Sequence, residues 1–355
     1  MQISKVSVSP VELKLKVPFR SAYHREAVTS IPVVFVRAEL VRQAESAWGC
    51  ATFDPALSGL TLEQVTAACQ ACAERLPELS PLNTQFALSE LSGLTQSIPS
   101  VRCAFDMLLY DLLGLWTGLP LYRLLGGFRE RIQTSITISA SGVEESVSMA
   151  RARAGEGFRV IKLKGGLDPE VDVRRIKAVH DALPGLILRL DADQGYSLQE
   201  ALDVARVLEG RLEFLEQPTA ADDLQVLRQV TDLSPVPILA DESLSGPESA
   251  LQIVSLRAAH GVSTKLSTCG GLDCARQIDT IARAGGLSTM VGCLNEPALA
   301  IAAGLGFALS SPNVRYGDLD GHFDLLDDPT QASFQFKDGW LIAGERPGLG
   351  CGVSF

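Results

Sequence analysis

The sequence lacks several of the features that assign a protein to a class. Aromatic residues make up only 6% of the 355 residues, and basic residues are outnumbered, with 31 Lys and Arg against 42 Asp and Glu. A net charge of -11 without a basic stripe argues against a nucleic-acid-binding surface. No apolar run reaches the roughly 18 residues of a membrane span, and the alternating start Met1–Val6 does not resemble a signal peptide. We therefore expect a cytoplasmic protein with neither nucleic acid nor membrane as a partner.

The eight cysteines also lack the spacing of a complete metal site. Cys69 and Cys72 have the spacing of half a zinc site, but no second pair of this spacing follows. Both fall in a helical pattern over residues 61–76, where a separation of three places the two thiols on one helix face. Scattered thiols of this kind are typical of a reducing compartment.

The pattern of the chain changes at about residue 125. Residues 1–125 mix strand and helix patterns, as an α+β unit does, and the hydrophobic content of 46% is sufficient for a large core. Residues 126–330 alternate short apolar runs with helical segments, which is typical of a parallel sheet. Residues 331–355 have strand and turn character. We predict a capping domain, a catalytic barrel and a C-terminal segment that returns towards the cap, with these bounds.

The ends of the predicted strands in the second part recur at a nearly constant step. We place them at Thr137, Lys164, Asp191, Glu216, Asp241, Lys265, Gly292 and Asp318. Successive ends lie 24 to 27 residues apart, the length of one strand and one helix. Eight such units predict an α/β fold, a modified (β/α)8 TIM-type barrel with an N-terminal α+β capping domain. A doubly wound sheet would alternate similarly, but its glycine-rich phosphate-binding motif is missing.

Carboxylates end the third, fourth and fifth strands. These residues are Asp191, Glu216 and Asp241. Because the active sites of such barrels lie at the carboxyl ends of the strands, the three side chains should converge. Three oxygen ligands without His or Cys suit a hard cation completed by water and substrate oxygens, which predicts Mg²⁺. Three unrelated salt bridges are the alternative interpretation.

Lysines end the second and the sixth strands. Lys164 and Lys265 would face each other across the barrel mouth, and Lys162 shares a strand face with Lys164. A second lysine and a nearby divalent cation disfavour the charged form, so we expect a lowered pKa for Lys164. Lys162 would tune that pKa and hold a substrate oxygen. Two bases on opposite faces, with a metal that stabilises an enediolate, predict inversion at a carbon α to a carboxylate.

Taken together, these motifs resemble the enolase superfamily, specifically its muconate-lactonizing-enzyme-like subgroup. The matching segments are Lys162-Leu-Lys164, Asp191-Ala-Asp-Gln, Glu216-Gln-Pro, Asp241-Glu-Ser, and Lys265-Leu with Cys269-Gly-Gly after it. The resemblance implies a modified barrel under an α+β cap, with lysine bases and Mg²⁺ as the cofactor. Asp193 departs from the family, which often has Asn there, and adds negative charge near the metal.

The eighth strand carries a closer resemblance, to the dipeptide epimerases and their L-Ala-D/L-Glu members. The similar segments are Arg315-Tyr-Gly-Asp-Leu-Asp-Gly321 and the tail Glu345-Arg-Pro-Gly-Leu-Gly350. The resemblance implies that Asp318 and Asp320 bind the free α-ammonium of a dipeptide. It implies a Mg²⁺-dependent enzyme that inverts the α-carbon of the C-terminal residue, by 1,1-proton transfer between the two lysines through a metal-stabilised enediolate.

Two cap loops set the substrate side chain in this family, and here they correspond to Pro18–Arg25 and Trp48–Pro55. Members that act on Ala-Glu dipeptides carry an arginine in the first loop. Its position is occupied here by His24, with Arg25 next to it. A hydrophobic or other side chain at the C-terminal residue is therefore as compatible with the sequence as glutamate.

Other substrate contacts and other functions remain open at this point. Thr137, at the first strand end, and Glu296, after the seventh, are further candidates for substrate binding. An N-acylamino acid racemase, an o-succinylbenzoate synthase or a cycloisomerase would use the same barrel, but their substrates lack the ammonium that Asp318 and Asp320 would bind. A barrel that only binds an amino-acid derivative is a third interpretation. A homo-oligomer is compatible with the sequence.

Overall fold

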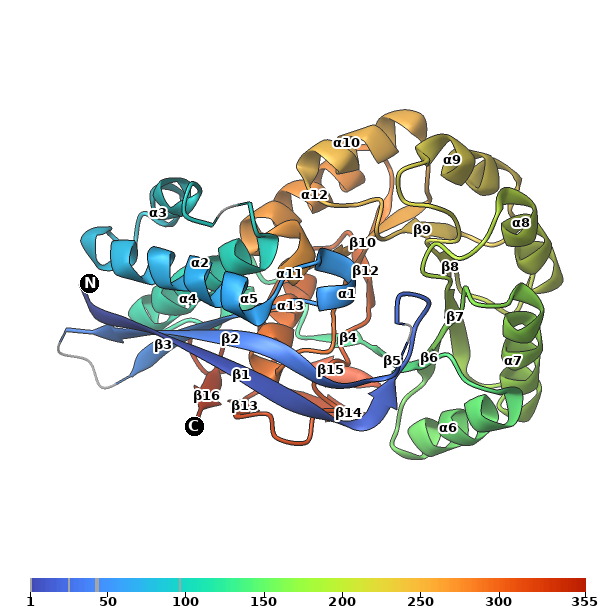
Figure 1. The fold of residues 1–355 in the computed structure, drawn as a ribbon, viewed down its shortest axis with the longest axis horizontal. Helices are drawn as coiled ribbons and strands as arrows, with labels where there is room; N and C mark the ends of the chain where they lie inside the picture. The colour runs from blue at the N-terminus through green and yellow to red at the C-terminus, as the bar shows by residue number, and fades with distance from the viewer. Residues whose placement is uncertain (1, 25, 42–44, 96) are drawn as a thin grey trace.

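The computed structural model describes residues 2–24, 26–41, 45–95 and 97–355. It confirms the predicted fold class. An eight-stranded parallel sheet is curled into a nearly closed barrel, and an antiparallel sheet with helices forms a cap beside it (Figure 1). The two barrel-edge strands approach each other through an isolated parallel bridge between Thr134 and Gly317.

The cap is built on a three-stranded antiparallel sheet of order β1-β2-β3. Its elements are β1 (Ile3–Phe19), β2 (Val28–Leu40), β3 (Ser46–Thr52), α1 (Pro55–Ser58), α2 (Leu62–Arg75), a short 3-10 turn (Leu76–Glu78), α3 (Thr84–Leu91), α4 (Pro99–Thr117) and α5 (Leu121–Leu124). Helix α2 begins after Thr61, whose side chain forms a reciprocal capping box with Gln64. Cys69 and Cys72 both point into the core of the cap.

One cap segment differs from its prediction. Trp48–Pro55 was expected to be a loop, but its first five residues belong to β3. This strand has no alternation of buried and exposed residues, because α4 packs closely against it. At Gly49 a β-carbon would lie 2.0 Å from the carbonyl oxygen of Ala104 in α4. The strand contains small residues that permit this contact, so it lacks the period-two pattern by which strands are recognised in a sequence.

The barrel alternates strands and helices along the chain. Its strands are β5 (Ser135–Ile138), β6 (Val160–Lys164), β7 (Ile187–Asp191), β8 (Leu215–Glu216), β9 (Ile238–Ala240), β10 (Gly261–Lys265), β11 (Ser288–Gly292) and β12 (Val314–Gly317). Its helices are α6 (Val143–Gly155), α7 (Pro169–Ala182), α8 (Leu198–Val207), α9 (Leu224–Leu233), α10 (Pro247–Leu256), α11 (Leu266–Cys269), α12 (Leu272–Ala284) and α13 (Ala298–Ser310). The strands are ordered β5 to β12.

The register of the strands brings the predicted strand ends to one rim. Lys164 pairs with Asp191, and Asp191 pairs in turn with Glu216. On the other side of the barrel Lys265 pairs with Gly292. Because all neighbouring strands are parallel, their carboxyl-terminal residues face the same end of the barrel.

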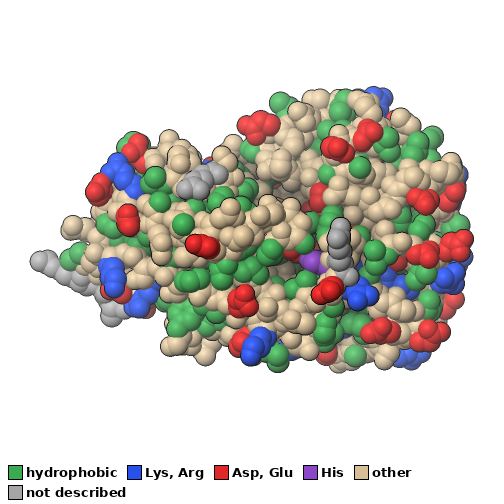
Figure 2. Space-filling view, in the orientation of Figure 1, with side chains coloured by type: hydrophobic (Ala, Val, Ile, Leu, Met, Phe, Trp, Pro, Cys, Tyr) green, Lys and Arg blue, Asp and Glu red, His purple; other side chains and the backbone are tan. Residues whose placement is uncertain are grey.

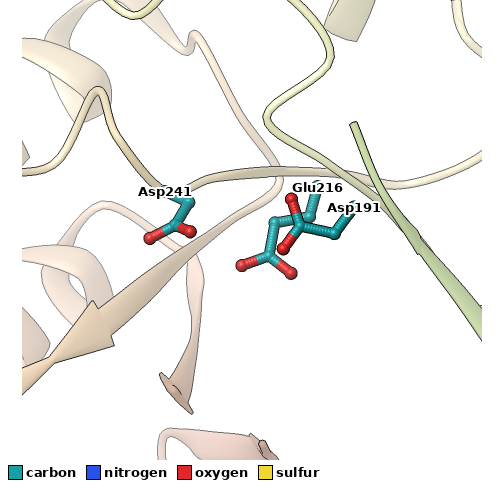
Figure 3. A group of neighbouring side chains, drawn as sticks. All are labelled: Asp191, Glu216 and Asp241. Carbon is teal, nitrogen blue, oxygen red and sulfur yellow. The ribbon is translucent and has the colours of Figure 1, made fainter. Parts of the chain in front are cut away.

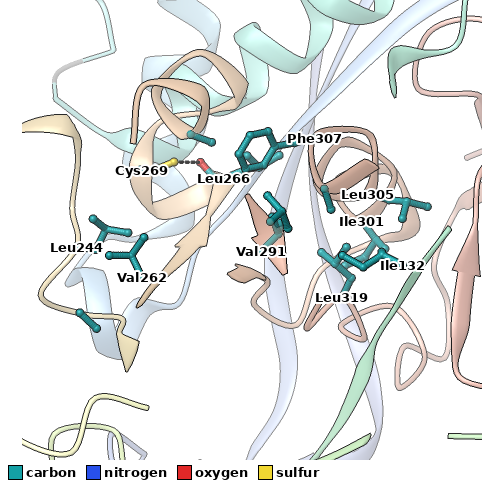
Figure 4. Close-up of a cluster of buried hydrophobic side chains, with 14 of the residues drawn as sticks. Ile132, Leu244, Val262, Leu266, Cys269, Val291, Ile301, Leu305, Phe307 and Leu319 are labelled. Carbon is teal, nitrogen blue, oxygen red and sulfur yellow. Dashed lines mark hydrogen bonds between the residues drawn. The ribbon is translucent and has the colours of Figure 1, made fainter. Parts of the chain in front are cut away.

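A continuous hydrophobic core joins the barrel to part of the cap. Figure 4 shows side chains of this core, in which Val291 of β11 and Leu319 lie beside Ile301 of α13. Helix α13 is buried along almost its whole length, since it packs against α5, β3, β11 and β13. The cap is thereby fixed to the side of the barrel where β11 and β12 end.

The chain continues after β12 into short strands, which are β13 (Thr330–Ala332), β14 (Gln335–Lys337), β15 (Trp340–Ile342) and β16 (Cys351–Val353). Strand β15 pairs with β4 (Arg131–Gln133), and the ring of Phe355 lies 5.2 Å from that of Phe35 in the cap. The domain bounds of 1–125, 126–330 and 331–355 stay a prediction.

The surface mixes charges of both signs. Figure 2 shows acidic and basic side chains side by side over the barrel helices on one face. Among the described residues, no helix is long and apolar enough to cross a membrane.

Candidate active site

Three buried carboxylates converge at the barrel mouth. Asp191, Glu216 and Asp241 each offer an oxygen atom, and these oxygens all lie within 4.8 Å of one another. Figure 3 shows the three side chains directed towards a common space. One Glu216 oxygen, Oε1, is buried without a hydrogen-bond partner. Burial, followed by the charge of Asp191, raises the pKa of Glu216 well above its ordinary value. An oxygen-only donor set with an unpartnered oxygen fits a hard divalent cation such as Mg²⁺.

The three lysines predicted for the site all contact these carboxylates. Lys162 Nζ lies 2.9 Å from Asp191 Oδ2 and 3.0 Å from Glu216 Oε2. Lys164 Nζ donates to Asp191 Oδ2 at 2.8 Å. Lys265 Nζ donates to Asp241 Oδ2. The lysines on β6 and β10, the second and sixth of eight strands, therefore flank the carboxylate cluster from opposite sides of the barrel.

The protein groups around Lys164 oppose the lowering expected for its pKa, which stays a prediction for the site with its cation. Burial and the charge of Lys162 do lower the pKa of Lys164, but Asp191 and Asp193 outweigh them and raise it. Asp193 Oδ1 accepts a hydrogen bond of 2.6 Å from Lys164 Nζ. The end of β7 brings two carboxylates to Lys164, and the spacing of the motif does not reveal that both contact it.

Asp318 and Asp320 follow β12 and reach the same pocket. Asp318 Oδ2 accepts from Lys162 Nζ at 2.6 Å, and its Oδ1 accepts from Ser135 Oγ at 2.5 Å. Burial opposes the charge of Asp318, but Lys162 outweighs burial and lowers its pKa. Burial and Asp318 raise the pKa of Asp320 to about 6. The pair is therefore a buried source of negative charge opposite the cap.

Two other predicted contacts lie in different surroundings. Thr137 lines the pocket, and its backbone N–H donates to Asp320 Oδ2 at 2.6 Å. Glu296 is buried next to the cap, where it accepts a hydrogen bond of 3.0 Å from Thr52 Oγ1. Burial raises the pKa of Glu296 to about 8. Glu296 thus joins the barrel to β3, and it is absent from the described residues that line the pocket.

The pocket is a cavity of about 280 Å³ between the barrel mouth and the cap. On the cap side it is lined by residues between 19 and 24, at the end of β1 and just after it, and by α1, which lies near the strand ends (Figure 1). Its cap wall is largely apolar and includes Phe19, Ile31 and Phe53, while Leu294 lines it from the barrel. Arg25 lies outside the described residues.

His24 lies in this wall with both ring nitrogens engaged. Its Nδ1 is 3.0 Å from Ser21 Oγ, and its Nε2 is 2.9 Å from Asp54 Oδ2. Asp54 also caps α1 by accepting from Ala56 N–H at 2.8 Å. Burial disfavours the charge of Asp54, but the hydrogen bond and charge of His24 outweigh it and lower the pKa of Asp54.

Several residues that line the pocket were not singled out from the sequence. They are Glu242 and Cys293, and also Tyr23 and Asp54, which lie within the two predicted specificity loops. Glu242 directly follows the predicted ligand Asp241, and Asp54 precedes a proline at a helix start, a position typical of capping residues. These local signals indicate a polar residue or a cap, but they carry no information that the side chain faces a cavity.

The comparisons with known proteins agree with this geometry. A family model described as enolase C-terminal domain-like matches residues 145–354. This chain belongs to that family. The match confirms the resemblance inferred from the lysine and carboxylate motifs.

Several relatives of this enolase-like chain are dipeptide epimerases. An L-Lys-D/L-Arg epimerase of Methylococcus capsulatus is 37% identical, over 99% of each chain. The substrate-liganded L-Ala-D/L-Glu epimerase of Bacillus subtilis superposes with a TM-score of 0.95 at 31% identity, covering 100% of both chains. A dipeptide epimerase of Enterococcus faecalis, complexed with Mg and L-Leu-L-Tyr, gives a TM-score of 0.94 at 29% identity, covering 99% of both.

Proposed function

We propose that this protein is a Mg²⁺-dependent dipeptide epimerase that inverts the α-carbon of the C-terminal residue. The observation that carries the proposal is the placement of Lys164 and Lys265. They stand on the second and sixth strands of the barrel, both line one pocket, and each donates a hydrogen bond to a member of the carboxylate cluster. A substrate held between them presents opposite faces of one carbon to two bases.

Asp191, Glu216 and Asp241 would hold the Mg²⁺ ion. When bound, the ion supplies positive charge that stabilises negative charge developing on the substrate carboxylate. Lys162 is buried between Asp191, Glu216 and Asp318, and we assign it a supporting role in orienting that carboxylate. Its long side chain is held by three carboxylates, so its ammonium is fixed in place.

The two other lysines carry the proton. In one direction Lys164 Nζ, as the neutral amine, removes the α-proton from one face and becomes an ammonium, while the Lys265 ammonium gives a proton to the opposite face and becomes the neutral amine. In the reverse direction the roles exchange. General acid–base catalysis requires that each group lies within reach of the proton it transfers, and both lysine side chains line the pocket.

Asp318 and Asp320 favour a free dipeptide over an N-acylated amino acid. An α-ammonium taken from water into a buried pocket needs carboxylate partners. The two residues supply such partners and line the pocket together with Thr137. An N-acylamino acid has no cation there, which would leave two buried carboxylates without a counter-ion from the substrate.

We further propose that the side chain of the epimerised residue is apolar or cationic. His24 offers no free N–H to a substrate carboxylate, since Ser21 and Asp54 occupy its ring nitrogens. The ionised Asp54 lies beside Phe19 and Phe53, a wall that suits an apolar side chain or the stem of a lysine or arginine. The relatives that act on Lys-Arg or bind Leu-Tyr support this preference.

The function is tested by proton NMR of a dipeptide library in D₂O with the enzyme and Mg²⁺. We expect loss of one α-proton signal and the appearance of the second diastereomer, most rapidly for apolar or cationic C-terminal residues. Exchange of N-succinyl amino acids without exchange of any free dipeptide would instead assign the chain to the racemases of N-acylamino acids.

We also propose a cytoplasmic location, which the eight free cysteines support. Association into a homo-oligomer stays a prediction.

A further inference from the structure

A second polar cluster lies behind the strand that carries Lys164. It consists of Arg175 and Asp172 on α7 and Tyr196 after β7, and we call it the Arg175 cluster. The three side chains are 1%, 3% and 4% exposed. Burying an arginine is costly unless each part of its guanidinium finds a partner. The partners of Arg175 lie on α6, on β6, on α7 and just after β5, which are neighbouring elements on one side of the barrel.

Arg175 binds two backbone carbonyls at the strand ends. Its Nη1 donates to the carbonyl oxygen of Lys164 at 2.6 Å, and its Nη2 donates to that of Ser139, after β5, at 2.8 Å. Its Nε donates to Ser146 Oγ of α6 at 2.8 Å. The fork of the guanidinium therefore fixes the ends of β5 and β6 relative to each other.

Asp172 holds the turn that follows Lys164. Its Oδ1 accepts from Arg175 Nη1 at 3.0 Å, and its Oδ2 accepts from the Gly166 N–H and the Tyr196 hydroxyl, each at 2.8 Å. The turn leaves no room for adjustment, because a β-carbon at Gly166 would lie 2.0 Å from the carbonyl oxygen of Ala192. The backbone at Lys164 is thus held by two contacts, one at its own carbonyl and one at the N–H of Gly166 in the turn that follows.

We propose that Arg175 is a positioning residue for Lys164, one of the two bases of the proposed epimerisation, and that it does not act on Lys265. The inference rests on the proposed function. Lys265 is on β10, four strands away, and its contact is with Asp241 rather than with any member of the Arg175 cluster. The cluster therefore stabilises the geometry of one base only.

The asymmetry gives a direct test. A two-base enzyme exchanges the α-proton of each diastereomer through the base that faces it, so exchange can be followed separately for the two diastereomers. In Arg175→Lys the charge remains, but a single ammonium cannot reach both carbonyls and Ser146 in the same geometry. We expect solvent-deuterium exchange of the diastereomer served by Lys164 to fall about 10- to 100-fold, since small displacements of a catalytic group have effects of this size. Exchange of the other diastereomer should stay near the wild-type rate.

Reference variants identify the two diastereomers. Lys164→Arg and Lys265→Arg should each abolish exchange of one diastereomer, and Arg175→Lys should share the pattern of Lys164→Arg. Tyr196→Phe removes only one hydroxyl from the cluster and should give the same asymmetry in weaker form. It serves as the test if Arg175→Lys fails to fold.

A matched control is Asp279→Asn. Asp279 is 7% exposed and accepts hydrogen bonds from Ser311 and Asn313 near the opposite, amino-terminal ends of β11 and β12. Its substitution should lower the melting temperature without any asymmetry in exchange. The inference would be overturned if Arg175→Lys and Tyr196→Phe lowered the exchange rate equally for both diastereomers and if this decrease followed the loss of stability, as in the control. Exchange of both diastereomers by the wild type tests the proposed function separately.

Discussion

His24 Nε2 and Asp54 Oδ2 lie 2.9 Å apart and join the two cap segments that cover the pocket. The first belongs to the turn between β1 and β2, and the second caps α1. This single contact therefore engages His24, which stands at the position of the arginine found in members that act on Ala-Glu dipeptides, and it places a carboxylate at the same wall. The preference for the substrate side chain depends on this pair.

Replacing His24 by arginine should change that preference. An arginine has five N–H groups, so it can contact Asp54 and still donate to a substrate carboxylate. We expect His24→Arg to raise kcat/KM for L-Ala-L-Glu about tenfold relative to wild type, equivalent to about 1.4 kcal/mol. His24→Gln, which can bond Asp54 without adding charge, is the control. No gain in the arginine variant, measured by polarimetry over the dipeptide panel, would show that the side-chain site lies elsewhere.

Removing the charge of Asp320 should weaken binding of the substrate amine. A hydrogen bond between charged groups contributes about 1.5 to 3 kcal/mol, so Asp320→Asn should reduce kcat/KM for free dipeptides by about 10- to 100-fold. The exposed Asp222→Asn, beyond β8 on the same rim, is the control for a general loss of negative charge. If Asp320→Asn has kinetics like those of the control, this residue does not bind the ammonium.

Asp106 should make stability depend on pH. This α4 side chain is fully buried, and burial raises its pKa from 3.8 to about 7, although the Asp273 amide opposes the shift. Between these values the unfolded chain releases a proton that the folded chain retains, so this contribution to stability declines from pH 4 to pH 7 and stays low above. Asp106→Asn imitates the protonated form without titrating.

We expect Asp106→Asn to gain stability relative to wild type as the pH rises from 5 to 8, by an amount on the order of 1 to 4 kcal/mol. Urea unfolding at both pH values measures the change, and the exposed Asp203→Asn serves as the control. An identical pH dependence for Asp106→Asn and wild type would mean that Asp106 is already ionised in the folded protein.

The sequence predicts the barrel and its strand ends because both depend on a short repeat. Lys164, Asp191, Glu216, Lys265 and Gly292 are the last residues of their strands, as the step of 24 to 27 residues indicates. Parallel strands then bring these residues together without any further information. The carboxylate cluster is therefore predictable from strand order alone.

Contacts between distant segments are not predictable in this way. The pairing of His24 with Asp54 depends on how two cap segments fold over the barrel, and the pKa of Lys164 depends on Asp193 reaching it from the next strand end. Strand β3 was missed for a similar reason, since Gly49 is selected by its contact with α4 rather than by a local strand pattern.

The central claim is that Lys164 and Lys265 act on opposite faces of one carbon. The most direct measurement follows a single preferred dipeptide in D₂O with Mg²⁺ and analyses the first few per cent of product by mass spectrometry and proton NMR. Almost every molecule of the new diastereomer should carry deuterium at the α-carbon, because a base on the opposite face delivers it. New diastereomer that retains the original α-proton would show transfer by a single base and would exclude a two-base mechanism with Lys164 and Lys265.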